Sequence, residues 1–219
     1  MAVKAKKPWP TKAVMAQVYD MKLWGGKALD FYSGAGSHNP EIVNPYLNTL
    51  TTFLESFSTP LVVCDLGCGD FNIGSHLVKS TKKYIAIDIV EKLISRNKKL
   101  YKEDNLEFYC LDIAKDELPS GDCIILRQVL QHLSNEEIQR IALKLYAYKY
   151  IVLTEHLPLG DFIFNKDIIS GQGIRLKQNS GVNLLESPFN LKIEEEKILG
   201  EHILENNKGR IVTMLYQMF

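Results

Sequence analysis

The chain has 219 residues, of which 46% are hydrophobic, and its 26 Lys and Arg residues balance its 26 Asp and Glu residues. This composition is typical of a single folded domain with a substantial core, and it excludes disordered, collagen-like and membrane-spanning classes. A net charge of zero gives no overall attraction to nucleic acid or anionic lipid, so we expect neither as a partner.

The first ten residues are predicted to be a frayed tail. They include Lys4, Lys6 and Lys7 but no apolar run long enough for a secretory signal. The four cysteines form no C-x-x-C pair and no cluster with histidines, so they are predicted to be small core residues. These features together favour a cytoplasmic location.

Residues 1–58 are predicted to form an N-terminal helical cap and lid segment. Thr11 is the expected N-cap of a short amphipathic helix, and a second helix is expected over residues 40–57 with a bend or a restart at Pro45. Between the two helices, residues 24–40 contain too many glycines for regular structure. We expect this segment to be a loop that closes over a ligand.

Residues 59–219 are predicted to form the main domain, in one compact unit with the cap. Strands and helices alternate there, which indicates a parallel sheet with helices on both faces. The expected strands are 61–65, 84–88, 106–110, 122–126 and 150–155, and the expected helices are 72–80, 90–101 and 134–147. Two last strands, 191–199 and 210–218, flank a turn at 206–209 and predict an antiparallel hairpin. The predicted fold class is therefore α/β: a Rossmann-like, doubly wound, mostly parallel seven-stranded sheet with an antiparallel C-terminal hairpin.

Residues 157–190 break this alternation. They contain four glycines, two prolines and apolar residues without a clear period, so we expect a structured insertion on the substrate side. Arg175 in this insertion is either a clamp for an anionic acceptor or a solvated side chain.

The segment VVCDLGCGD at 62–70 predicts a strand that turns tightly beneath a ligand. Gly67 and Gly69 allow positive φ and a close approach to the backbone. A dinucleotide-binding turn would have a third glycine where Asn72 stands, and Asp65 and Asp70 would repel phosphate. A cationic, nucleotide-like ligand therefore suits the segment better.

An acid ends each of the first three predicted strands: Asp65, Asp88 and Asp112. Carboxyl ends of parallel strands share one sheet edge, where such folds bind ligands at the point of strand-order reversal. Asp88 lies 88 − 65 = 23 residues beyond Asp65, near the ~20-residue spacing of ribose-binding acids. Asp112 is either a ligand contact or an ordinary helix N-cap.

These residues resemble the class I S-adenosylmethionine-dependent methyltransferases, whose first motif is similar to VCDLGCG at 63–69. The resemblance spans about residues 60–156 and the terminal hairpin, and it departs at Phe71, where the motif often has a third glycine. More narrowly, the stretch LRQVLQHLS at 126–134 and the glycine-rich segment resemble a group of small bacterial methyltransferases whose acceptors are mostly unassigned.

The resemblance implies S-adenosylmethionine as the cofactor. It implies that Asp65 and the backbone of residues 67–69 hold the methionine end, that Asp88 binds the ribose hydroxyls, and that Asp112 binds the adenine amino group. Carboxylates and carbonyl dipoles suit the positive charge of a sulfonium. We expect Asp88→Ala to weaken cofactor binding with little loss of stability, because the residue is predicted at the mouth of a crevice.

Further cofactor contacts follow from the same resemblance. Ile113 is expected on the adenine face, and Arg127 and Gln128 end the fourth strand near the methionine amino group. Trp24 either covers the cofactor or packs the cap helix onto the core. The full expected set is Trp24, Asp65, Gly67, Cys68, Gly69, Asp88, Ile89, Asp112, Ile113, Arg127 and Gln128.

Four side chains are candidates for acid–base catalysis. His38 is either a base that reaches the acceptor when the loop closes or a turn residue. His132 is either a base near the site or a packing residue, and the pair Glu155 and His156 at the end of the fifth strand is either catalytic or structural. Adjacent strand residues point to opposite faces, so this pair does not converge on one ion and no metal is expected.

The predicted function is methyl transfer to oxygen or nitrogen of a small-molecule acceptor, with sugar-linked and phosphorylated metabolites as candidates. Orientation and desolvation under the closed loop would supply most of the acceleration. The alternatives are a noncatalytic cofactor-binding or assembly subunit and, with less support, a nicotinamide-dependent oxidoreductase. A monomer or a homodimer is expected.

Overall fold

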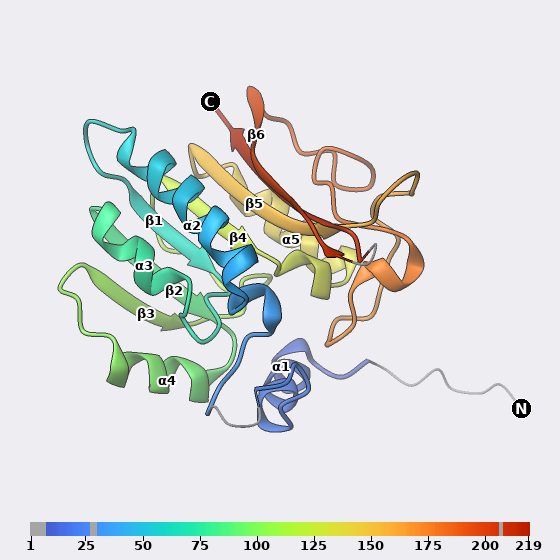
Figure 1. The fold of residues 1–219 in the computed structure, drawn as a ribbon, viewed down its shortest axis with the longest axis horizontal. Coiled ribbons are helices and arrows are strands. Elements are labelled where there is room, and N and C mark those ends of the chain that lie inside the picture. Colours follow the sequence, from blue (N-terminus) through green and yellow to red (C-terminus); the bar gives the residue numbers. More distant parts are fainter. Residues whose placement is uncertain (1–7, 27–29, 206–207) are drawn as a thin grey trace, which may run out of the picture.

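The computed structural model describes residues 8–26, 30–205 and 208–219 of the chain (Figure 1). The predicted tail at residues 1–7 and Asn206 and Asn207 of the predicted turn lie outside the described residues.

The described strands form one seven-stranded sheet in the order β3-β2-β1-β4-β5-β7-β6. Their bounds are β1 (Val62–Leu66), β2 (Lys83–Asp88), β3 (Leu106–Cys110), β4 (Cys123–Arg127), β5 (Tyr150–Leu157), β6 (Glu195–Ile203) and β7 (Arg210–Gln217). The first five strands pair in parallel, whereas β7 is antiparallel to both β5 and β6. The predicted fold class is confirmed, and the strand order reverses between β1 and β4.

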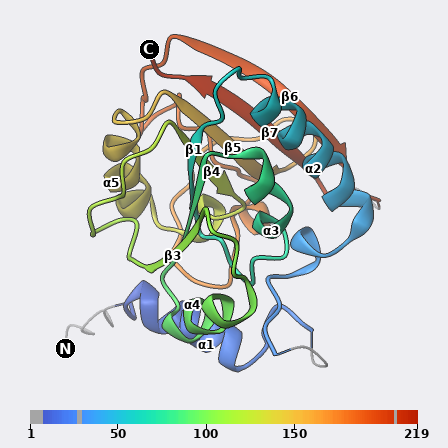
Figure 2. The ribbon, with the colours of Figure 1, turned by 90° about the vertical axis from the view of Figure 1, so that its left-hand side faces the viewer.

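Five α-helices and four short 3-10 turns connect the described strands. The helices are α1 (Thr11–Asp20), α2 (Pro40–Glu55), α3 (Gly74–Leu77), α4 (Glu91–Leu100) and α5 (Asn135–Leu145), and the turns are η1 (Ala35–Ser37), η2 (Val78–Ser80), η3 (Leu130–His132) and η4 (Arg175–Gln178). Figure 2 shows α5 on one side of the sheet and α2 with α3 on the other. In Figure 1, α1 lies across the edge toward which the parallel strands point.

Two hydrophobic clusters cover the two faces of the sheet. Along β1, Cys64 and Leu66 join the cluster beneath α1 and α5, whereas Val63 joins the cluster beneath α2 and α3. This alternation follows from the two-residue period of a strand. Both faces are buried because helices cover both, which explains the continuous apolar character of these strands.

Four local predictions need correction. Thr11 is the first residue of α1 and not its cap, which is Pro10, and its hydroxyl donates to Glu137 instead of accepting from a helix amide. The helix α2 continues through Pro45, with Asn39 as the N-cap that accepts from the Glu41 amide. The expected helix at 72–80 is divided into α3 and η2, and β6 starts at residue 195 instead of 191.

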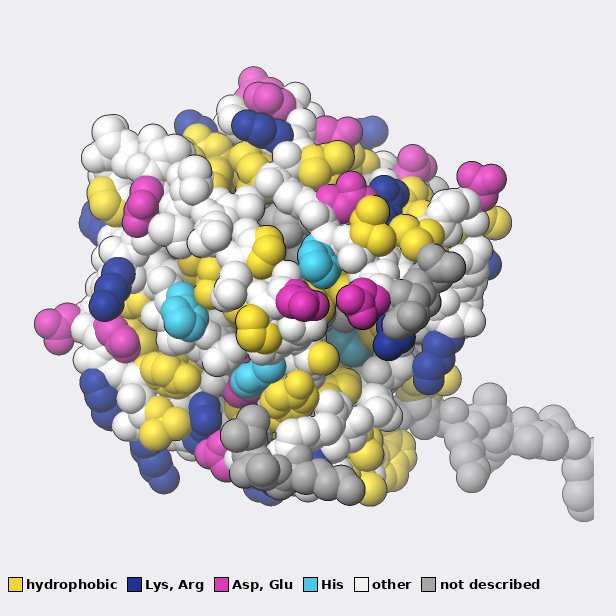
Figure 3. Space-filling view, viewed as in Figure 1, with side chains coloured by type: hydrophobic (Ala, Val, Ile, Leu, Met, Phe, Trp, Pro, Cys, Tyr) yellow, Lys and Arg dark blue, Asp and Glu magenta, His cyan; other side chains and the backbone are white. Residues whose placement is uncertain are grey.

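The surface carries charges of both signs. Figure 3 shows basic and acidic side chains scattered among apolar ones on one face, without a large patch of a single sign. Within the described ranges, no helix combines the length and the hydrophobicity needed to cross a bilayer.

Candidate functional site

A cavity of about 440 Å³ lies at the carboxyl ends of the parallel strands, where β1 and β4 diverge. Its walls come from α1 and the glycine-rich segment, the β1–α3 turn, the insertion, the ends of β2, β3, β4 and β5, and the segment from β4 to the start of α5. Open α/β sheets bind ligands at such a switch point, and the volume lies in the range of small-molecule sites. The structure thus places a ligand-sized space where the strand-end acids predict one.

Asp88 lies in the wall of this cavity at the end of β2. Its two carboxylate oxygens accept from the Gly69 amide (3.1 Å) and the Val90 amide (2.9 Å), and burial raises the pKa of Asp88 to about 6. The side chain is only 8% exposed. An alanine would leave two amide donors without an acceptor, so the expectation that Asp88→Ala costs little stability is wrong.

The turn after β1 has the shape that the motif predicts. Gly67 has φ +85°, and a Cβ atom there would lie 2.4 Å from a methyl group of Val129. Gly69 has φ +56°, and the space beside it is filled by Ser33. Close packing of neighbouring loops therefore requires these glycines. Phe71 takes the same left-handed conformation (φ 64°) without being glycine, and its fully buried ring packs against Tyr84.

Asp65 does not line the main cavity. It has the same strand parity as Val63 and faces α2, where the Tyr84 hydroxyl donates to it over 3.0 Å. It borders a second cavity of about 30 Å³ with Tyr46 and Arg127. Burial raises the pKa of Asp65 to about 7. The resemblance implies that Asp65 holds the methionine end of the cofactor. Because this carboxylate does not line the main cavity, we leave Asp65 out of the proposed site.

Asp112 follows β3 and also lies in the cavity wall. Its carboxylate accepts from the Ala114 amide (3.1 Å) and from Lys115 Nζ (2.6 Å). No helix begins there, so the helix-cap alternative is replaced by a turn that the side chain stabilises. Ile89 and Ile113 lie in the same part of the wall and provide apolar surface next to Asp88.

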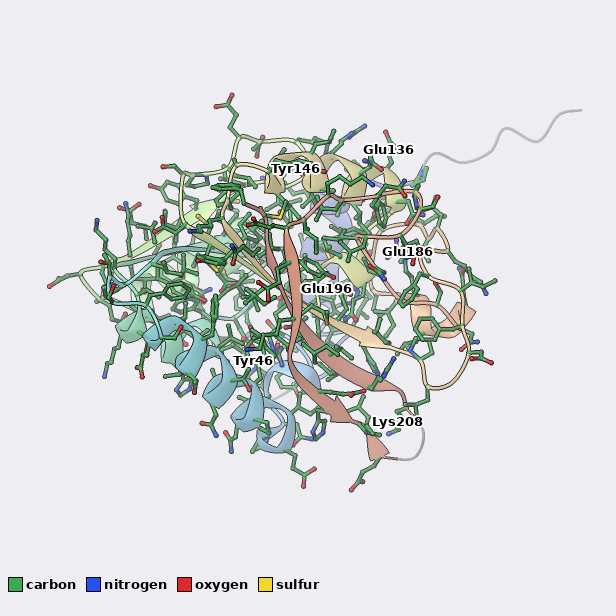
Figure 4. The ribbon with its side chains drawn as sticks, turned by 90° about the horizontal axis from the view of Figure 1, so that it is seen from above. Tyr46, Glu136, Tyr146, Glu186, Glu196 and Lys208 are labelled. Atoms are coloured by element: carbon green, nitrogen blue, oxygen red, sulfur yellow. The ribbon has the colours of Figure 1, made fainter. Side chains whose placement is uncertain are left out.

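The residues that end β4 connect the sheet to the glycine-rich segment. Arg127 donates to the Gly36 carbonyl (2.6 Å) and to the Ser37 hydroxyl (3.2 Å), and its guanidinium stacks over the Tyr46 ring at 4.6 Å. Tyr46, labelled in Figure 4, belongs to α2. Gln128 has a left-handed backbone (φ 57°), and its backbone N–H donates to the Thr154 carbonyl in β5 (2.7 Å).

Three buried polar atoms in the cavity wall have no hydrogen-bond partner among the described residues. They are Arg127 Nε, Gln128 Nε2 and Gln131 Oε1. A buried polar atom without a partner costs free energy, so such atoms indicate where a polar ligand binds. Arg127 and Gln128 belong to the predicted cofactor-binding set, whereas Gln131 was not predicted.

Trp24 both packs and lines the cavity. Its ring meets Tyr19 edge-on at 5.2 Å and lies 5.2 Å from the His132 ring. The two alternatives for this residue are thus compatible, since the indole packs against Tyr19 of α1 and also forms part of the cavity wall.

Asp70 fastens the glycine-rich segment to the turn after β1. Its Oδ2 accepts from the Ser33 amide (2.9 Å) and lies 2.6 Å from His38 Nε2, and the Asp70 amide donates back to the Ser33 hydroxyl. His38 also stacks on the Tyr32 ring at 4.4 Å and does not line the main cavity. We therefore assign His38 to this attachment and do not carry it forward as a base.

Glu137 joins three walls of the cavity. It is the last residue of the S-x-x-E pattern that begins at Ser134, and its carboxylate accepts from the Thr11 and Ser170 hydroxyls as well as from Ser134. It therefore connects the first residue of α1, the start of α5 and the insertion. The capping-box pattern predicts a helix start and gives no sign of these longer-range contacts.

Arg175 is neither a solvated residue nor a free clamp. Its guanidinium is 1% exposed and donates to the carbonyls of Lys166 (3.0 Å), Leu130 (2.9 Å) and Leu133 (2.7 Å), and to Asn135 Oδ1 (2.7 Å). Both alternatives from the sequence are wrong. The residue holds the insertion against the turn between β4 and α5.

Glu155 and His156 have different surroundings, as expected for neighbours on a strand. Glu155 is 3% exposed, and its pKa is raised to about 8 by burial, partly offset by the charge of Arg175. His156 lines the cavity, and its Nε2 donates to the carbonyl of Lys208, which is labelled in Figure 4 (2.7 Å). Burial lowers the pKa of His156. Within the described residues, no group of three His, Cys, Asp or Glu side chains is arranged to hold a metal ion.

The raised pKa of Glu155 predicts a pH-dependent stability. The unfolded chain ionises this carboxyl near its ordinary pKa of 4.5, while the folded protein keeps it protonated up to about pH 8. With respect to this group, the protein therefore has its full stability below pH 4.5 and loses roughly 4–5 kcal/mol as the pH rises to about 8. Urea unfolding at several pH values should show that Glu155→Gln removes this part of the decline. An identical pH slope in both proteins would contradict the assignment.

The comparisons with known proteins agree with this geometry. Residues 63–148 match the family described as a methyltransferase domain. The match runs from β1 to the turn after α5, which includes the whole β1–α3 turn and the ends of β2, β3 and β4. Residues 63–148 are thus a methyltransferase domain. The resemblance seen in the sequence is confirmed, and with it S-adenosylmethionine as the cofactor of this methyltransferase domain.

Solved structures share the fold of the methyltransferase domain and its flanking segments. The N-methyltransferase NodS from Bradyrhizobium japonicum WM9, in complex with S-adenosyl-L-homocysteine, has a TM-score of 0.67 at 12% identity, covering 94% of this chain and 98% of NodS. Magnesium protoporphyrin IX methyltransferase from Synechocystis PCC 6803 has a TM-score of 0.59 at 14% identity, covering 97% and 100%. Human N-acetylserotonin methyltransferase has a TM-score of 0.59 at 16% identity, covering 95% and 60%. A search of curated proteins finds no match.

Proposed function

We propose that the chain transfers a methyl group from S-adenosylmethionine to oxygen or nitrogen of a small-molecule acceptor. The observation that carries the proposal is the cavity at the β1–β4 switch point, with Asp88 in its wall and a methyltransferase family match over the strands that build it. The fold alone would not decide the activity, since one fold serves many chemistries.

The wall fits the chemical groups of this cofactor. Asp88 has carboxylate lone pairs for a ribose diol, and Ile89 and Ile113 offer apolar surface for an adenine ring. At the other end, Gln128 and Arg127 present buried nitrogens without a partner among the described residues, which suits a carboxylate. When bound, the cofactor would supply an activated methyl group on a positively charged sulfur.

The chain itself supplies enclosure and orientation. Thr11, Tyr19 and Trp24 close one side of the cavity, and Ile174 of the insertion closes another. A closed wall removes water and fixes the reacting groups, which are the main sources of acceleration in a direct transfer. Because the wall is formed by side chains on both sides, it favours a small acceptor over a folded macromolecule.

Isothermal titration tests the proposal. We expect saturable binding of S-adenosylhomocysteine and S-adenosylmethionine, with a Kd between about 1 μM and 1 mM, the range usual for enzyme substrates. Nicotinamide dinucleotides serve as the control ligands and are expected to give no heat. Folded protein that binds neither adenosyl compound would contradict the proposal, and binding without transfer to any acceptor would favour the noncatalytic alternative.

A further inference from the structure

His132 stands in the wall of the cavity with its ring orientation fixed by the insertion. It is part of η3, is partly exposed, and lies 5.2 Å from the Trp24 ring. Its Nδ1 is 3.1 Å from the Gly171 carbonyl and 3.3 Å from the Gly173 carbonyl. Carbonyl oxygens only accept hydrogen bonds, so Nδ1 carries the proton and the lone pair of the neutral ring is on Nε2.

A second acceptor atom lies beside that lone pair. Gln131 Nε2 is 3.3 Å from His132 Nε2 and donates to it, which directs Gln131 Oε1 away from the ring. This oxygen is buried and has no partner among the described residues. Gln131 Oε1 therefore lacks a donor, and the Nε2 lone pair of His132 has only the long 3.3 Å contact from Gln131 Nε2. This part of the cavity wall suits a ligand that donates a hydrogen bond.

The surroundings keep His132 neutral. Its Nδ1 has carbonyl partners instead of a carboxylate, and Arg175 binds both carbonyls that flank η3, those of Leu130 and Leu133. Burial is the main cause that lowers the pKa of His132 to about 4, and the charge of Arg175 lowers it further. The Gly171 amide also donates to the His132 carbonyl over 2.9 Å. The insertion thus sets both the position and the tautomer of this ring.

Resting on the proposed function, we infer that the acceptor atom is a hydroxyl oxygen and that Nε2 of His132 takes its proton. In the transfer, the oxygen forms a bond to the methyl carbon while the bond from that carbon to sulfur breaks, and the sulfur keeps the electron pair. The hydroxyl proton passes to His132 Nε2 and then to solvent. The products are a methyl ether and S-adenosylhomocysteine.

A weak base suits this reaction and not the methylation of an amine. A methylated oxygen that still holds its proton is a very strong acid, so even an imidazole of low basicity accepts that proton. A methylated alkylamine keeps its proton, since its pKa is near that of lysine, about 10. The neutral ring of His132, close to the cation of Arg175, is also a poor partner for an ammonium group.

The other candidate bases are placed less well. Glu155 is buried near η3 and Arg175 and does not line the cavity. His156 lines it, but its Nε2 is engaged by the Lys208 carbonyl, which leaves the lone pair on Nδ1, the nitrogen nearer its own main chain. Of these three side chains, only His132 lines the cavity with its lone pair on Nε2, where an acceptor hydroxyl would replace the long contact from Gln131 Nε2 (3.3 Å).

Nitrogen NMR on histidine-labelled protein tests the tautomer without any acceptor. At pH 7 we expect the His132 signal, identified by its loss in His132→Asn, to report a neutral ring with the proton on Nδ1. A proton on Nε2, or an imidazolium at this pH, would overturn the inference.

A variant series tests the chemistry. His132→Asn keeps an amide nitrogen where Nδ1 donates to the Gly171 carbonyl but removes the lone pair, and His156→Gln keeps the contact to Lys208. His76→Asn, on the exposed side of α3, is the matched control. Transfer is measured against paired acceptors: phenols with anilines, and sugars with amino sugars.

The wild-type protein is expected to form methyl ethers, and His132→Asn to lower that rate by roughly 10²- to 10⁴-fold. Titration with S-adenosylhomocysteine should give the same Kd in His132→Asn, His76→Asn and wild type within about twofold. Products methylated only on nitrogen, or a full rate in His132→Asn with a loss in His156→Gln, would overturn the inference while cofactor binding still supported the proposed function. Absence of cofactor binding in the wild type would instead contradict the proposed function.

Discussion

Asp88→Asn is expected to lower the affinity for S-adenosylhomocysteine by about 10- to 100-fold. The ribose diol would donate to a carboxylate, and hydrogen bonds to a charged group contribute about 1.5–3 kcal/mol. The amide keeps one oxygen for the Gly69 or Val90 amide, so the fold is disturbed less than by alanine. Isothermal titration of both proteins gives the ratio of Kd values.

Asp20→Asn is the matched control for this variant. Asp20 is a half-exposed acid in α1 that pairs with Lys92 and does not line the cavity. We expect it to bind S-adenosylhomocysteine as the wild type does. Urea unfolding of each variant separates a loss of affinity from a loss of folded protein. Equal affinities for wild type and Asp88→Asn would remove the ribose role from Asp88.

Arg175→Met is expected to destabilise the protein by about 3–5 kcal/mol. The substitution leaves three carbonyls and Asn135 Oδ1 without their donor and removes the positive charge that partly offsets the burial of Glu155. Urea unfolding at pH 7 measures the loss. Arg140→Met, which removes a half-exposed arginine of α5 that pairs with Glu136, should cost less than about 1 kcal/mol.

The double variant Arg175→Met with Glu155→Gln, unfolded alongside the single variants at pH 9, where Glu155 is ionised, isolates the electrostatic part. If the charge of Arg175 matters to Glu155, the double variant loses less stability than the sum of the two single changes. Strict additivity would show that Arg175 acts only through its four hydrogen bonds. A cost for Arg175→Met no larger than that of Arg140→Met would contradict its role as the anchor of the insertion.

Most of the fold could be predicted because its signals are local. Buried strands such as β1 are continuous apolar runs, and the S-x-x-E pattern at Ser134 marks the start of α5. Errors arose where a tertiary contact overrides a local preference. Thr11 resembles an N-cap, yet its hydroxyl is used by Glu137, which is 126 residues away. The predicted domain division, the oligomeric state and the cellular location stay predictions.

The site was predictable at the strand ends and less so elsewhere. Asp88 and Asp112 reach the cavity because strand ends converge there, but Asp65 has the parity that directs its side chain to the opposite face. Strand parity was readable from the apolar neighbours and could have given this result. The contacts of Asp70 and Arg175 join segments far apart in sequence, and no local pattern encodes them.

The docking of the glycine-rich segment has a kinetic consequence. Residues 33–37 are joined to the rest of the protein by the side chains of Asp70, Asn72 and Arg127, and belong to no strand of the sheet. A nucleoside-sized product can leave once these few polar attachments part, while the sheet stays intact. Release of S-adenosylhomocysteine, on the microsecond-to-millisecond timescale of loop opening, would then limit kcat.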